Sequence, residues 1–372
     1  MLFRKVSTII GGALLIISIA ALITGGSLGR VVPERYELST LQSTPENPLL
    51  NAPEEEPVET EKITRIPAEF EALDYVILSY TGNNPEFYDF IRQLLPVTKV
   101  LLIKDNGISD ERLFADLEKH SIPTDDQNLF IKEYPIDTYW VRDYGPMLIL
   151  KDGKPTIVDF SYKTRNINRQ QDDSIPYLLS EELNTEYLST DIRLLLGNFM
   201  TDGRGNCYSS TSLYEEAVTD ELSESDIDDF FHSIGCDTIR TLTKLEDERT
   251  THIDMFAKFV NENTVIVASM ENDTNTNILD ENARQFEEWG YKVVRIPIPQ
   301  RWLTYINLLL VNGHAFIPSY RASEEELGVL EEQIGQTFRD LGLVPHFIPS
   351  SYLIQRNGAI HCTSMQVPRI EA

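Results

Sequence analysis

Short apolar runs and segments of helical periodicity alternate along most of the chain. In the N-terminal half the expected elements are a buried strand at Asp74–Tyr80, a helix at Asn84–Leu95, a strand at Lys99–Ile103, a helix at Asp110–His120 with Asp110 as its N-cap, and a strand at Phe130–Tyr134. In the C-terminal half they are a helix at Glu281–Trp289, a strand at Lys292–Pro297, a hairpin of Leu308–Val311 and Ala315–Pro318 around Asn312-Gly313, a helix at Ser323–Leu341, and a strand at Val344–Ile348. Units of strand, strand, helix and strand therefore recur every ~50–60 residues, which predicts a repeated α/β architecture.

The first 29 residues have the pattern of a targeting segment. Arg4 and Lys5 precede an uncharged, largely apolar stretch from Val6 to Gly29. This stretch is long for a signal peptide, which needs about 7–15 apolar residues, and adequate for a membrane-spanning helix, which needs about 20. A cleaved signal peptide and a retained membrane anchor both remain open. Because basic residues tend to stay in the cytoplasm, both predict that the chain from Arg30 onward is extracytoplasmic, either secreted or anchored to the membrane.

Residues 30–65 differ in composition from the rest of the chain. They are rich in Pro, Glu, Asn, Ser and Thr, as in the run from Pro53 to Pro57. Such a segment buries too little apolar surface to order itself, so we expect a disordered acidic linker. The folded catalytic domain is expected at residues 66–372, a length sufficient for one large domain.

The 372-residue chain carries a formal net charge of −27. A surface this acidic repels nucleic acid and attracts cations, so we expect no nucleic-acid partner and consider a cationic substrate compatible with it. No G-x-G-x-x-G segment follows the first expected strand and no phosphate-binding loop occurs, so no nucleotide site is expected.

The chain contains three cysteines, Cys207, Cys236 and Cys362. Three are too few for a disulfide framework in so large a domain, and an odd number leaves at least one thiol without an intrachain partner. Cys207 and Cys236 could pair, but small, buried, unpaired side chains are the preferred interpretation for both.

Four polar clusters interrupt the apolar pattern: Trp140–Pro146, Gly197–Gly203, Thr251–Phe256 and Gly358–Thr363. The first suggests a strand end that opens into a pocket, and the last suggests a cysteine at the end of a strand. If the third is a strand, His252 and Asp254 share one of its faces.

Together these clusters could recognise and attack a guanidinium group. Two carboxylates can accept hydrogen bonds from its planar fork of donors, a thiolate can attack its central carbon, and a histidine can transfer protons. Each cluster taken singly also has a structural explanation, and His252, Asp254 and Cys362 could instead be ligands of a metal such as zinc.

Five stretches, in chain order, carry a more specific likeness: Trp140–Pro146, Gly197–Gly203, His252-Ile253-Asp254, Tyr305-Ile306-Asn307 and His361-Cys362. They closely resemble the guanidine-modifying branch of the pentein superfamily, specifically bacterial peptidylarginine deiminase and its relative agmatine deiminase. The resemblance spans roughly Ile66 to Ile370. It implies a five-bladed, pseudo-symmetric α/β propeller (the pentein fold), built from ββαβ-type units, with the active site on its axis.

The resemblance also implies a mechanism, the hydrolytic deimination of an arginine guanidinium to citrulline and ammonia through a thiouronium intermediate. Cys362 is then the nucleophile and His252 the general acid and base. Asp143 and Asp254 hold the guanidinium nitrogens, and Asn307 lies beside the cysteine. No metal or organic cofactor is needed for this chemistry.

The same resemblance extends to substrate contacts. Trp140 is expected to form a wall for the aliphatic stem, and Asn198 and Asp202 to be further contacts. Arg165 and Arg169 are the candidates for holding the free carboxylate of a C-terminal arginine, and Arg249 occupies the neighbourhood where the peptidylarginine branch has a tyrosine. The expected partner is therefore a peptide ending in arginine, or free arginine.

Three alternatives remain open. The first is a deiminase of a small guanidine such as agmatine, which arginines at the carboxylate site would repel. The second is an amidinotransferase of the same fold. The third is a non-enzymatic metal-binding or adhesion protein outside the cell.

Overall fold

The computed structural model describes residues 64–369, with gaps at residue 83, residues 163–168, residue 301 and residues 322–326. The expected leader, the expected linker up to residue 63, and Arg165 lie outside the described residues. Across the described part, no helix combines the length and the apolar character needed to cross a membrane.

Within the described ranges the strands form five separate sheets. In spatial order, the first contains β1 (Thr64–Arg65), β5 (Met147–Lys151), β6 (Lys154–Ser161) and β7 (Glu186–Arg193). The second contains β10 (Thr238–Leu242), β9 (Asn206–Ser210) and β8 (Met200–Thr201), and the third contains β11 (Ala257–Asn261), β12 (Thr264–Ser269) and β13 (Lys292–Pro297). The fourth contains β14 (Leu309–Val311), β15 (His314–Ser319) and β16 (Val344–Pro349), and the fifth contains β17 (Ser364–Pro368), β2 (Leu73–Tyr80), β3 (Lys99–Asp105) and β4 (Leu129–Tyr134).

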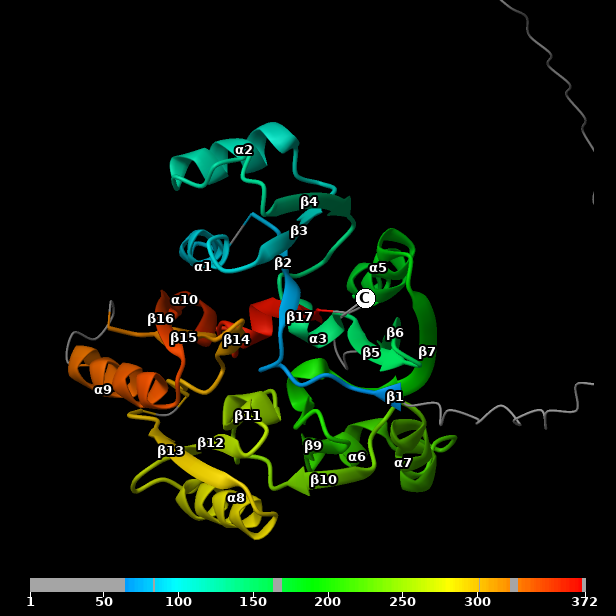
Figure 1. Ribbon diagram of the computed structural model, residues 1–372, viewed down its shortest axis with the longest axis vertical. Coiled ribbons are helices and arrows are strands. Elements are labelled where there is room, and N and C mark those ends of the chain that lie inside the picture. The colour runs from blue at the N-terminus through cyan, green and yellow to red at the C-terminus, as the bar shows by residue number, and fades with distance from the viewer. Residues whose placement is uncertain (1–63, 83, 163–168, 301, 322–326, 370–372) are drawn as a thin grey trace, which may run out of the picture. The chain divides into compact units, whose positions relative to one another are not determined.

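Helices of eight or more residues connect the parallel strands: α1 (Phe87–Leu94), α2 (Asp110–Lys119), α5 (Ile175–Leu183), α7 (Glu224–Ser233), α8 (Thr276–Glu288) and α9 (Leu327–Asp340). Shorter turns of α-helix are α3 (Val141–Tyr144), α4 (Gln170–Asp173), α6 (Ser212–Ala217) and α10 (Ser351–Ile354), and the 3₁₀ turns are η1 (Leu196–Asn198), η2 (Ile253–Met255) and η3 (His361–Thr363). Figure 1 shows α2, α5, α8 and α9 at the outside of the described domain, with α3 and β17 nearer its middle.

Each sheet contains the same ββαβ unit. The first two strands of a unit are antiparallel: β5–β6, β8–β9, β11–β12, β14–β15 and β17–β2. The third strand lies parallel to the second, and a helix supplies the crossover that a parallel pair requires. The fifth unit joins the two ends of the domain, because β17 pairs with β2. The α/β class and the repeated unit expected from the sequence are confirmed.

The expected elements are present with boundary shifts of a few residues. The Asn312-Gly313 hairpin is confirmed, since both residues have the positive φ angles of a tight hairpin turn (48° and 82°). The expected N-cap of α2 is wrong by one residue. The cap is Ser109, whose hydroxyl accepts a hydrogen bond from the backbone N–H of Arg112, and Asp110 is the first helical residue.

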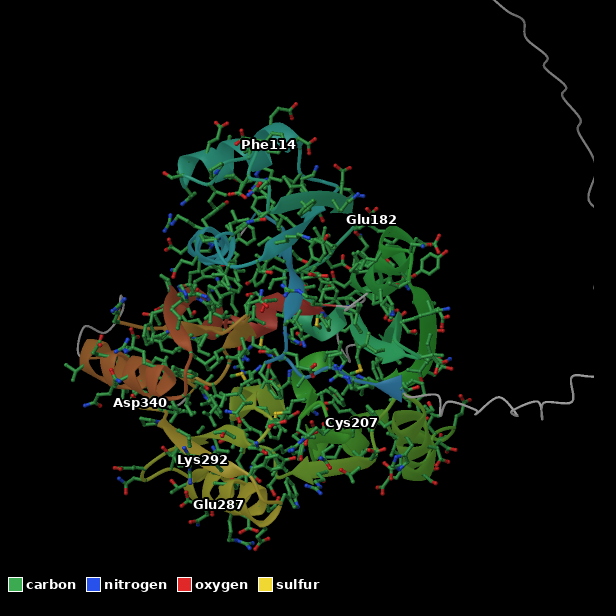
Figure 2. The ribbon with its side chains drawn as sticks, in the orientation of Figure 1. Phe114, Glu182, Cys207, Glu287, Lys292 and Asp340 are labelled. Atoms are coloured by element: carbon green, nitrogen blue, oxygen red, sulfur yellow. A yellow bond between two sulfur atoms is a disulfide. The ribbon has the colours of Figure 1, made fainter. Side chains whose placement is uncertain are left out.

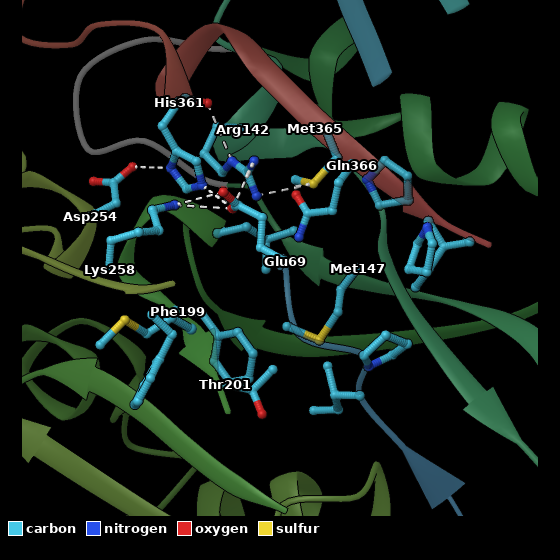
Figure 3. Close-up of a pocket in the computed structure, with 18 of the residues that line it drawn as sticks. Glu69, Arg142, Met147, Phe199, Thr201, Asp254, Lys258, His361, Met365 and Gln366 are labelled. Carbon is cyan, nitrogen blue, oxygen red and sulfur yellow. Dashed lines mark hydrogen bonds and ion pairs between the residues drawn. The ribbon is translucent and has the colours of Figure 1, made fainter. Parts of the chain in front are cut away.

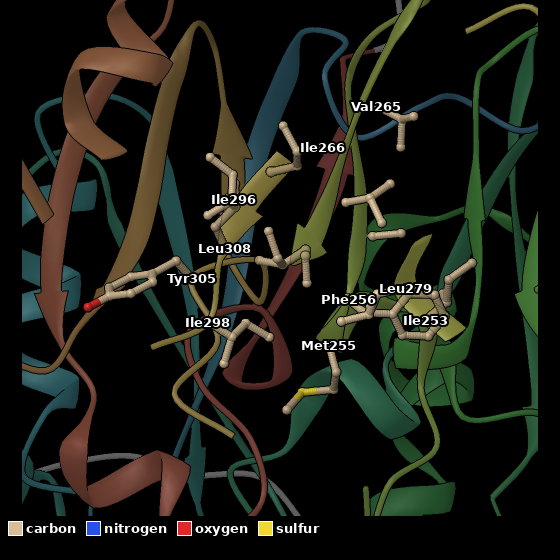
Figure 4. Close-up of a cluster of buried hydrophobic side chains, with 14 of the residues drawn as sticks. Ile253, Met255, Phe256, Val265, Ile266, Leu279, Ile296, Ile298, Tyr305 and Leu308 are labelled. Atoms are coloured by element: carbon tan, nitrogen blue, oxygen red, sulfur yellow. The ribbon is translucent and has the colours of Figure 1, made fainter. Parts of the chain in front are cut away.

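One hydrophobic core lies beneath the turn η2 (Figure 4). Ile253 and Met255 both enter this core, where they join Phe256, Leu279 and Tyr305. Burial of each such side chain contributes about 1.5–3 kcal/mol. Asp254, which lies between Ile253 and Met255, is therefore held on a turn whose two neighbouring side chains are buried in the core.

The structure joins Cys207 and Cys236 in a disulfide, so the preferred interpretation of two unpaired side chains is wrong. Cys207 lies in β9 and Cys236 shortly before β10, and these strands are parallel neighbours. The pairing depends on the crossover through α7, which brings Cys236, at the entry to β10, next to Cys207 in β9 although 29 residues separate them. Figure 2 shows Cys207 within the second sheet.

We expect the disulfide to stabilise the domain. Replacing both cysteines by alanine should lower the free energy of unfolding by about 2–4 kcal/mol, because the bond restricts the unfolded chain. Denaturant titration would measure this loss, with Cys362→Ala as the matched control that keeps the disulfide. A double variant as stable as the control would contradict the expectation.

Candidate active site

The five sequence motifs occupy one equivalent place in the five units, the turn just before the first strand of each unit. Asp143 lies in α3 before β5, Asn198 in η1 before β8, His252 directly before η2 and β11, Asn307 before β14, and Cys362 in η3 before β17. The strand ends expected for Asp143 and Cys362 are therefore wrong, and His252 and Asp254 do not share the face of a strand but lie at a 3₁₀ turn. A 3₁₀ turn spreads successive side chains around its axis, so Asp254 faces the site while its neighbours enter the core.

Cys362 and Asn307 form the first part of the site. Cys362 is the free cysteine of the chain and is 3% exposed. Its Sγ lies 3.2 Å from Asn307 Nδ2. Asn307 Oδ1 accepts hydrogen bonds from the backbone N–H groups of Ala359 (3.0 Å) and Cys362 (3.3 Å). Asn307 thus fixes both the thiol and the turn that carries it.

Asp254, His252 and Asp143 form the second part. Asp254 Oδ2 lies 3.8 Å from Cys362 Sγ, and His252 Nδ1 lies 3.9 Å from Asp143 Oδ1. Gly197 links the two pairs, because a Cβ atom on it would lie 2.4 Å from His252 Nδ1 and 3.2 Å from Asp254 Oδ2. The structure therefore brings the four predicted groups together: Cys362, Asp254, His252 and Asp143. His252 and Asp254 can approach each other because Gly197 has no side chain.

Three buried polar atoms of this cluster have no hydrogen-bond partner among the described residues: Asp143 Oδ1, His252 Nδ1 and Asp254 Oδ1. Leaving one such atom unpaired costs about 1–3 kcal/mol, and unpaired groups of this kind are a mark of functional sites. Two carboxylate acceptors beside a thiol are suited to a ligand that brings several N–H donors.

The electrostatics of the cluster favour a bound cation. Burial raises the pKa of Asp143 to about 6. Burial also opposes ionisation of Asp254, but the hydrogen bond and the charge of His361, together with the charges of His252 and Lys258, lower the pKa of Asp254 below its ordinary value. Burial raises the pKa of the Cys362 thiol well above its usual range, and the charges of Asp254 and Asp143 raise it further. A positive charge between the two carboxylates would reverse part of that effect.

A network of buried charges lies behind Asp254 (Figure 3). His361 contacts Asp254 Oδ2 through Nδ1 (2.6 Å) and Glu69 Oε2 through Nε2 (2.7 Å). Lys258 Nζ donates to both oxygens of Glu69 (3.0 and 3.1 Å). Arg142 Nη2 lies 3.8 Å from Glu69 Oε2, and Arg142 Nε donates to the His361 carbonyl (3.3 Å).

Besides a void of about 10 Å³ beside His252 and Asn198, two cavities adjoin the cluster. One, of about 430 Å³, is lined by Asp143 and His252 together with Arg193, Lys244 and Arg249. The other, of about 60 Å³, is lined by Asp254 and by Glu69, Arg142, Lys258 and His361. The larger cavity is the candidate substrate entrance, because Asp143 and His252 line it.

Two of the predicted substrate contacts lie beside the cluster. A Cβ atom on Gly358 would lie 2.6 Å from the Trp140 ring and 3.0 Å from Cys362 Cβ, so the indole borders the cysteine turn. Arg169 donates a hydrogen bond to the Tyr162 hydroxyl, and its charge acts on Asp143. Arg165 lies outside the described residues and stays a prediction.

Asn198 and Asp202 have contacts that do not fit the predicted role of substrate binding. Asn198 Oδ1 accepts the backbone N–H groups of Ile253 (3.1 Å) and Ser210 (3.0 Å), so this side chain braces the His252 turn. Asp202 is 1% exposed, and its carboxylate accepts hydrogen bonds from Asn206 and Tyr291. Both side chains use their acceptors to hold the backbone and neighbouring strands.

Sequence reasoning gave no role to Glu69, Arg142, Lys258 or His361. Glu69 lies in an acidic stretch that is typical of a surface loop. The usable signal was Lys258 within the apolar run of β11, because a lysine in a buried strand requires a buried acidic partner. In the described part of the chain, no group of three or more His, Cys, Asp or Glu side chains is arranged to hold a metal ion.

We expect Gly197→Ala to abolish most activity with little loss of stability. The new methyl group would displace His252 and Asp254, and a displacement of about 1 Å can cost about 100-fold in rate. Hydrolysis of an arginine-type guanidine would be compared with that of Gly328→Ala, a helix position with no heavy atom within 4 Å of an added Cβ. Equal activity of the two variants would show that His252 and Asp254 do not act at this position.

Comparisons with known proteins agree with the fold and the motifs. Residues 65–368 match the family model described as Porphyromonas-type peptidyl-arginine deiminase. An agmatine deiminase of Pseudomonas aeruginosa is 25% identical over 293 residues, which cover 66% of this chain and 78% of that relative.

Solved structures share the α/β fold. The agmatine deiminase of C. jejuni matches with a TM-score of 0.72 at 19% identity, over 84% of this chain and 98% of that chain. The agmatine deiminase of Enterococcus faecalis matches with a TM-score of 0.70 at 19% identity, over 83% and 96%. Since the family model covers nearly all of the described domain, the resemblance seen in the sequence is confirmed, and the chain belongs to the Porphyromonas-type peptidyl-arginine deiminase family.

Proposed function

We propose that the protein hydrolyses the guanidinium group of an arginine derivative to a ureido group and ammonia, with Cys362 as nucleophile. The observation that carries the proposal is the pair of buried carboxylates Asp143 and Asp254, each with an unpaired Oδ1, together with the Cys362 thiol, whose Sγ lies 3.8 Å from Asp254 Oδ2. A guanidinium offers planar N–H donors and a positive charge, which match two carboxylates.

The reaction proceeds in two balanced steps. Cys362 Sγ attacks the guanidinium carbon, and one amino group leaves as ammonia with the proton that the thiol gave up, which His252 transfers. The product is a cationic thiouronium on Cys362. Water deprotonated by His252 then adds to the same carbon, the carbon–sulfur bond breaks, and the Cys362 sulfur takes the proton back from His252 to regenerate the thiol. The hydroxyl proton of the adduct is released to solvent as the neutral ureido product leaves.

The bound substrate helps to ionise its own nucleophile. Burial and two carboxylates keep Cys362 protonated in the free protein. A guanidinium between Asp143 and Asp254 brings a positive charge next to Sγ and lowers the pKa of the thiol. The five ββαβ units would surround this centre as the blades of a propeller, with one motif turn from each.

For the substrate we propose a C-terminal peptidyl-arginine or free arginine. The larger cavity carries three cations, of which Lys244 pairs with Glu215 and Arg193 with Glu216. Arg249 forms no salt bridge with any residue that the structure describes, so its charge is available to a carboxylate. Arg169, whose charge acts on Asp143, is a second candidate.

Agmatine is the second candidate substrate. The relative from Pseudomonas aeruginosa and the structures from C. jejuni and Enterococcus faecalis bear the name agmatine deiminase. Glu215 and Glu216 at the same cavity could hold its ammonium group if they left their present partners.

We also propose that the domain works outside the cytoplasm, secreted or anchored by its N-terminal segment. The Cys207–Cys236 disulfide supports this location, because such bonds persist in oxidising compartments. The basic and apolar pattern of residues 1–29 supports it independently.

The decisive measurement is formation of the ureido product from four substrates: a peptide ending in arginine, the same peptide with an internal arginine, free arginine and agmatine. We expect turnover only where the arginine itself carries the free α-carboxylate, that is, of the peptide ending in arginine and of free arginine. Cys362→Ala should form no product from any of the four. Arg249→Gln should raise KM for those substrates by about 10-fold or more, since a charge-assisted contact contributes about 1.5–3 kcal/mol.

Other outcomes would change the proposal in defined ways. Turnover of agmatine alone would support the deimination mechanism but would show that agmatine, and not an arginine with a free carboxylate, is the substrate. A ureido product formed equally well by Cys362→Ala would remove the cysteine from the mechanism. Release of the amidino group only when an amine acceptor is added would indicate an amidinotransferase.

The pH dependence tests the role of Asp143. Burial raises its pKa to about 6, so below that pH it is protonated and loses its charge for the guanidinium. We expect kcat/KM to fall as the pH drops through about 6, and this fall to be absent from the weak residual activity of Asp143→Asn. A parent profile that is flat between pH 5 and 7 would contradict the assignment.

A further inference from the structure

We propose that Glu69 and His361 are positioning residues that together hold the carboxylate of Asp254 in place for the guanidinium. The inference rests on the proposed function, because Asp254 matters only if a cation binds beside Cys362. Neither residue touches the reacting atoms, and both act through Asp254.

His361 bridges two buried carboxylates with short contacts. Its Nδ1 lies 2.6 Å from Asp254 Oδ2 and its Nε2 lies 2.7 Å from Glu69 Oε2. All three side chains are shielded from solvent, with exposed fractions of 2%, 2% and 11% for His361, Asp254 and Glu69. With Oδ2 held in this way, Asp254 keeps Oδ1 unpaired.

Two contacts of this length require two protons. A neutral imidazole has one N–H, so its second nitrogen would face a carboxylate with a lone pair. The three groups therefore hold either an imidazolium between two carboxylates or a neutral imidazole with one protonated carboxyl. Both forms contain the same number of protons and carry one net negative charge, so the three titrate as a unit.

Glu69 anchors this unit to the rest of the domain. Its oxygens accept hydrogen bonds from Lys258 Nζ (3.0 and 3.1 Å) and from the backbone N–H of Leu310 (3.0 Å). Arg142 lies 3.8 Å away. The charged groups that face His361 are thus Glu69 from the segment after β1, Arg142 from α3, Asp254 from η2 and Lys258 from β11.

These surroundings explain why a histidine suits the bridge. Burial lowers the pKa of His361, and the charges of Arg142 and Lys258 lower it further, while the charge of Glu69 and the hydrogen bond to Asp254 act in the opposite direction. The form with a neutral ring is therefore favoured over a permanent imidazolium. Asp254 keeps a negative charge for the substrate and a fixed direction for Oδ1.

Two substitutions of His361 separate this role from simple packing. His361→Asn places an amide nitrogen near the position of Nδ1, where it still donates to Asp254, whereas His361→Gln places one near Nε2, where it donates to Glu69. We expect His361→Asn to keep kcat/KM within about 10-fold of the parent and His361→Gln to lose about 100-fold. The acidic limb of kcat/KM in His361→Gln should move to higher pH and steepen, because Asp254 then titrates together with Asp143.

A measurement without substrate tests the same contact. His361 lowers the pKa of Asp254, so the stability that this carboxylate contributes is present above its unfolded pKa of about 4 and is lost only as the pH falls through the lower folded value. Without that donor the folded pKa rises. The Tm of His361→Gln should therefore fall relative to the parent as the pH rises from 5 to 7.5, and the Tm of His361→Asn should not.

Glu69→Gln is a second variant should His361→Gln fail to fold. It keeps the shape and an acceptor for Leu310 and removes the charge that draws the proton onto His361. We expect the same upward shift of the acidic limb, smaller than in His361→Gln. Glu71→Gln is the matched control, since Glu71 lies on the same segment and pairs with Arg65; its pH profile should equal that of the parent.

The outcomes distinguish this inference from the proposed function. Equal losses in His361→Asn and His361→Gln with unshifted pH profiles, or a Tm difference that does not change with pH, would overturn the positioning role. A parent protein without any ureido product would overturn the proposed function, while the Tm series would still decide whether His361 holds Asp254 ionised.

Discussion

The buried carboxylate of Glu69 is the constraint on which the centre of the domain depends. It accepts hydrogen bonds from Lys258 of β11 and from the backbone N–H of Leu310 in β14. It also contacts His361 of η3 and lies near Arg142 of α3. Four of the five ββαβ units are therefore tied to one side chain from the segment after β1. Removing one partner of such a buried pair costs about 3–5 kcal/mol, because the other charge is left uncompensated. The centre holds its charges only in this arrangement, and Asp254 takes its position from it.

The repeated unit explains how residues so far apart in the sequence reach one site. Asp143, Asn198, His252, Asn307 and Cys362 recur at intervals of about 55 residues, each on the turn that opens its unit. The two asparagines do the same structural work. Asn198 Oδ1 accepts the N–H of Ile253 in the next unit, and Asn307 Oδ1 accepts the N–H of Cys362 in the next. One position of the repeat thus carries an aspartate, two bracing asparagines, a histidine and a cysteine on equivalent turns of the five units.

Much of this could be predicted from the sequence, and the failures share a physical cause. Apolar periodicity identified the strands and helices, because burial sets that pattern directly. Four of the five motifs were found because their polar side chains interrupt apolar segments, whereas Asn307 was identified only through the family resemblance. The turns were taken for strands, since a three-residue 3₁₀ turn has no periodicity of its own. Glu69 could not be predicted, because its partners are brought near by the stacking of units and not by local sequence. The Cys207–Cys236 pair depends on the crossover through α7 within one unit, which places the two cysteines side by side although 29 residues separate them. The contact of Asn198 with the backbone N–H of Ile253 also joins two units, so local sequence does not show it.

As a member of its family the chain is a hydrolase of guanidino groups, and the charge balance of the site is consistent with the mechanism proposed above. Burial and two carboxylates raise the pKa of the Cys362 thiol, so in that mechanism the thiol becomes a good nucleophile only when a positive charge lies between the carboxylates. The proposal assigns the binding of that charge to the same two carboxylates, which links recognition to activation. Asp143 reaches the larger cavity and titrates near neutral pH, whereas Asp254 is held by His361 and Glu69 and stays ionised. A site with two carboxylates of unequal acidity can thus keep one fixed charge for binding while the other responds to pH.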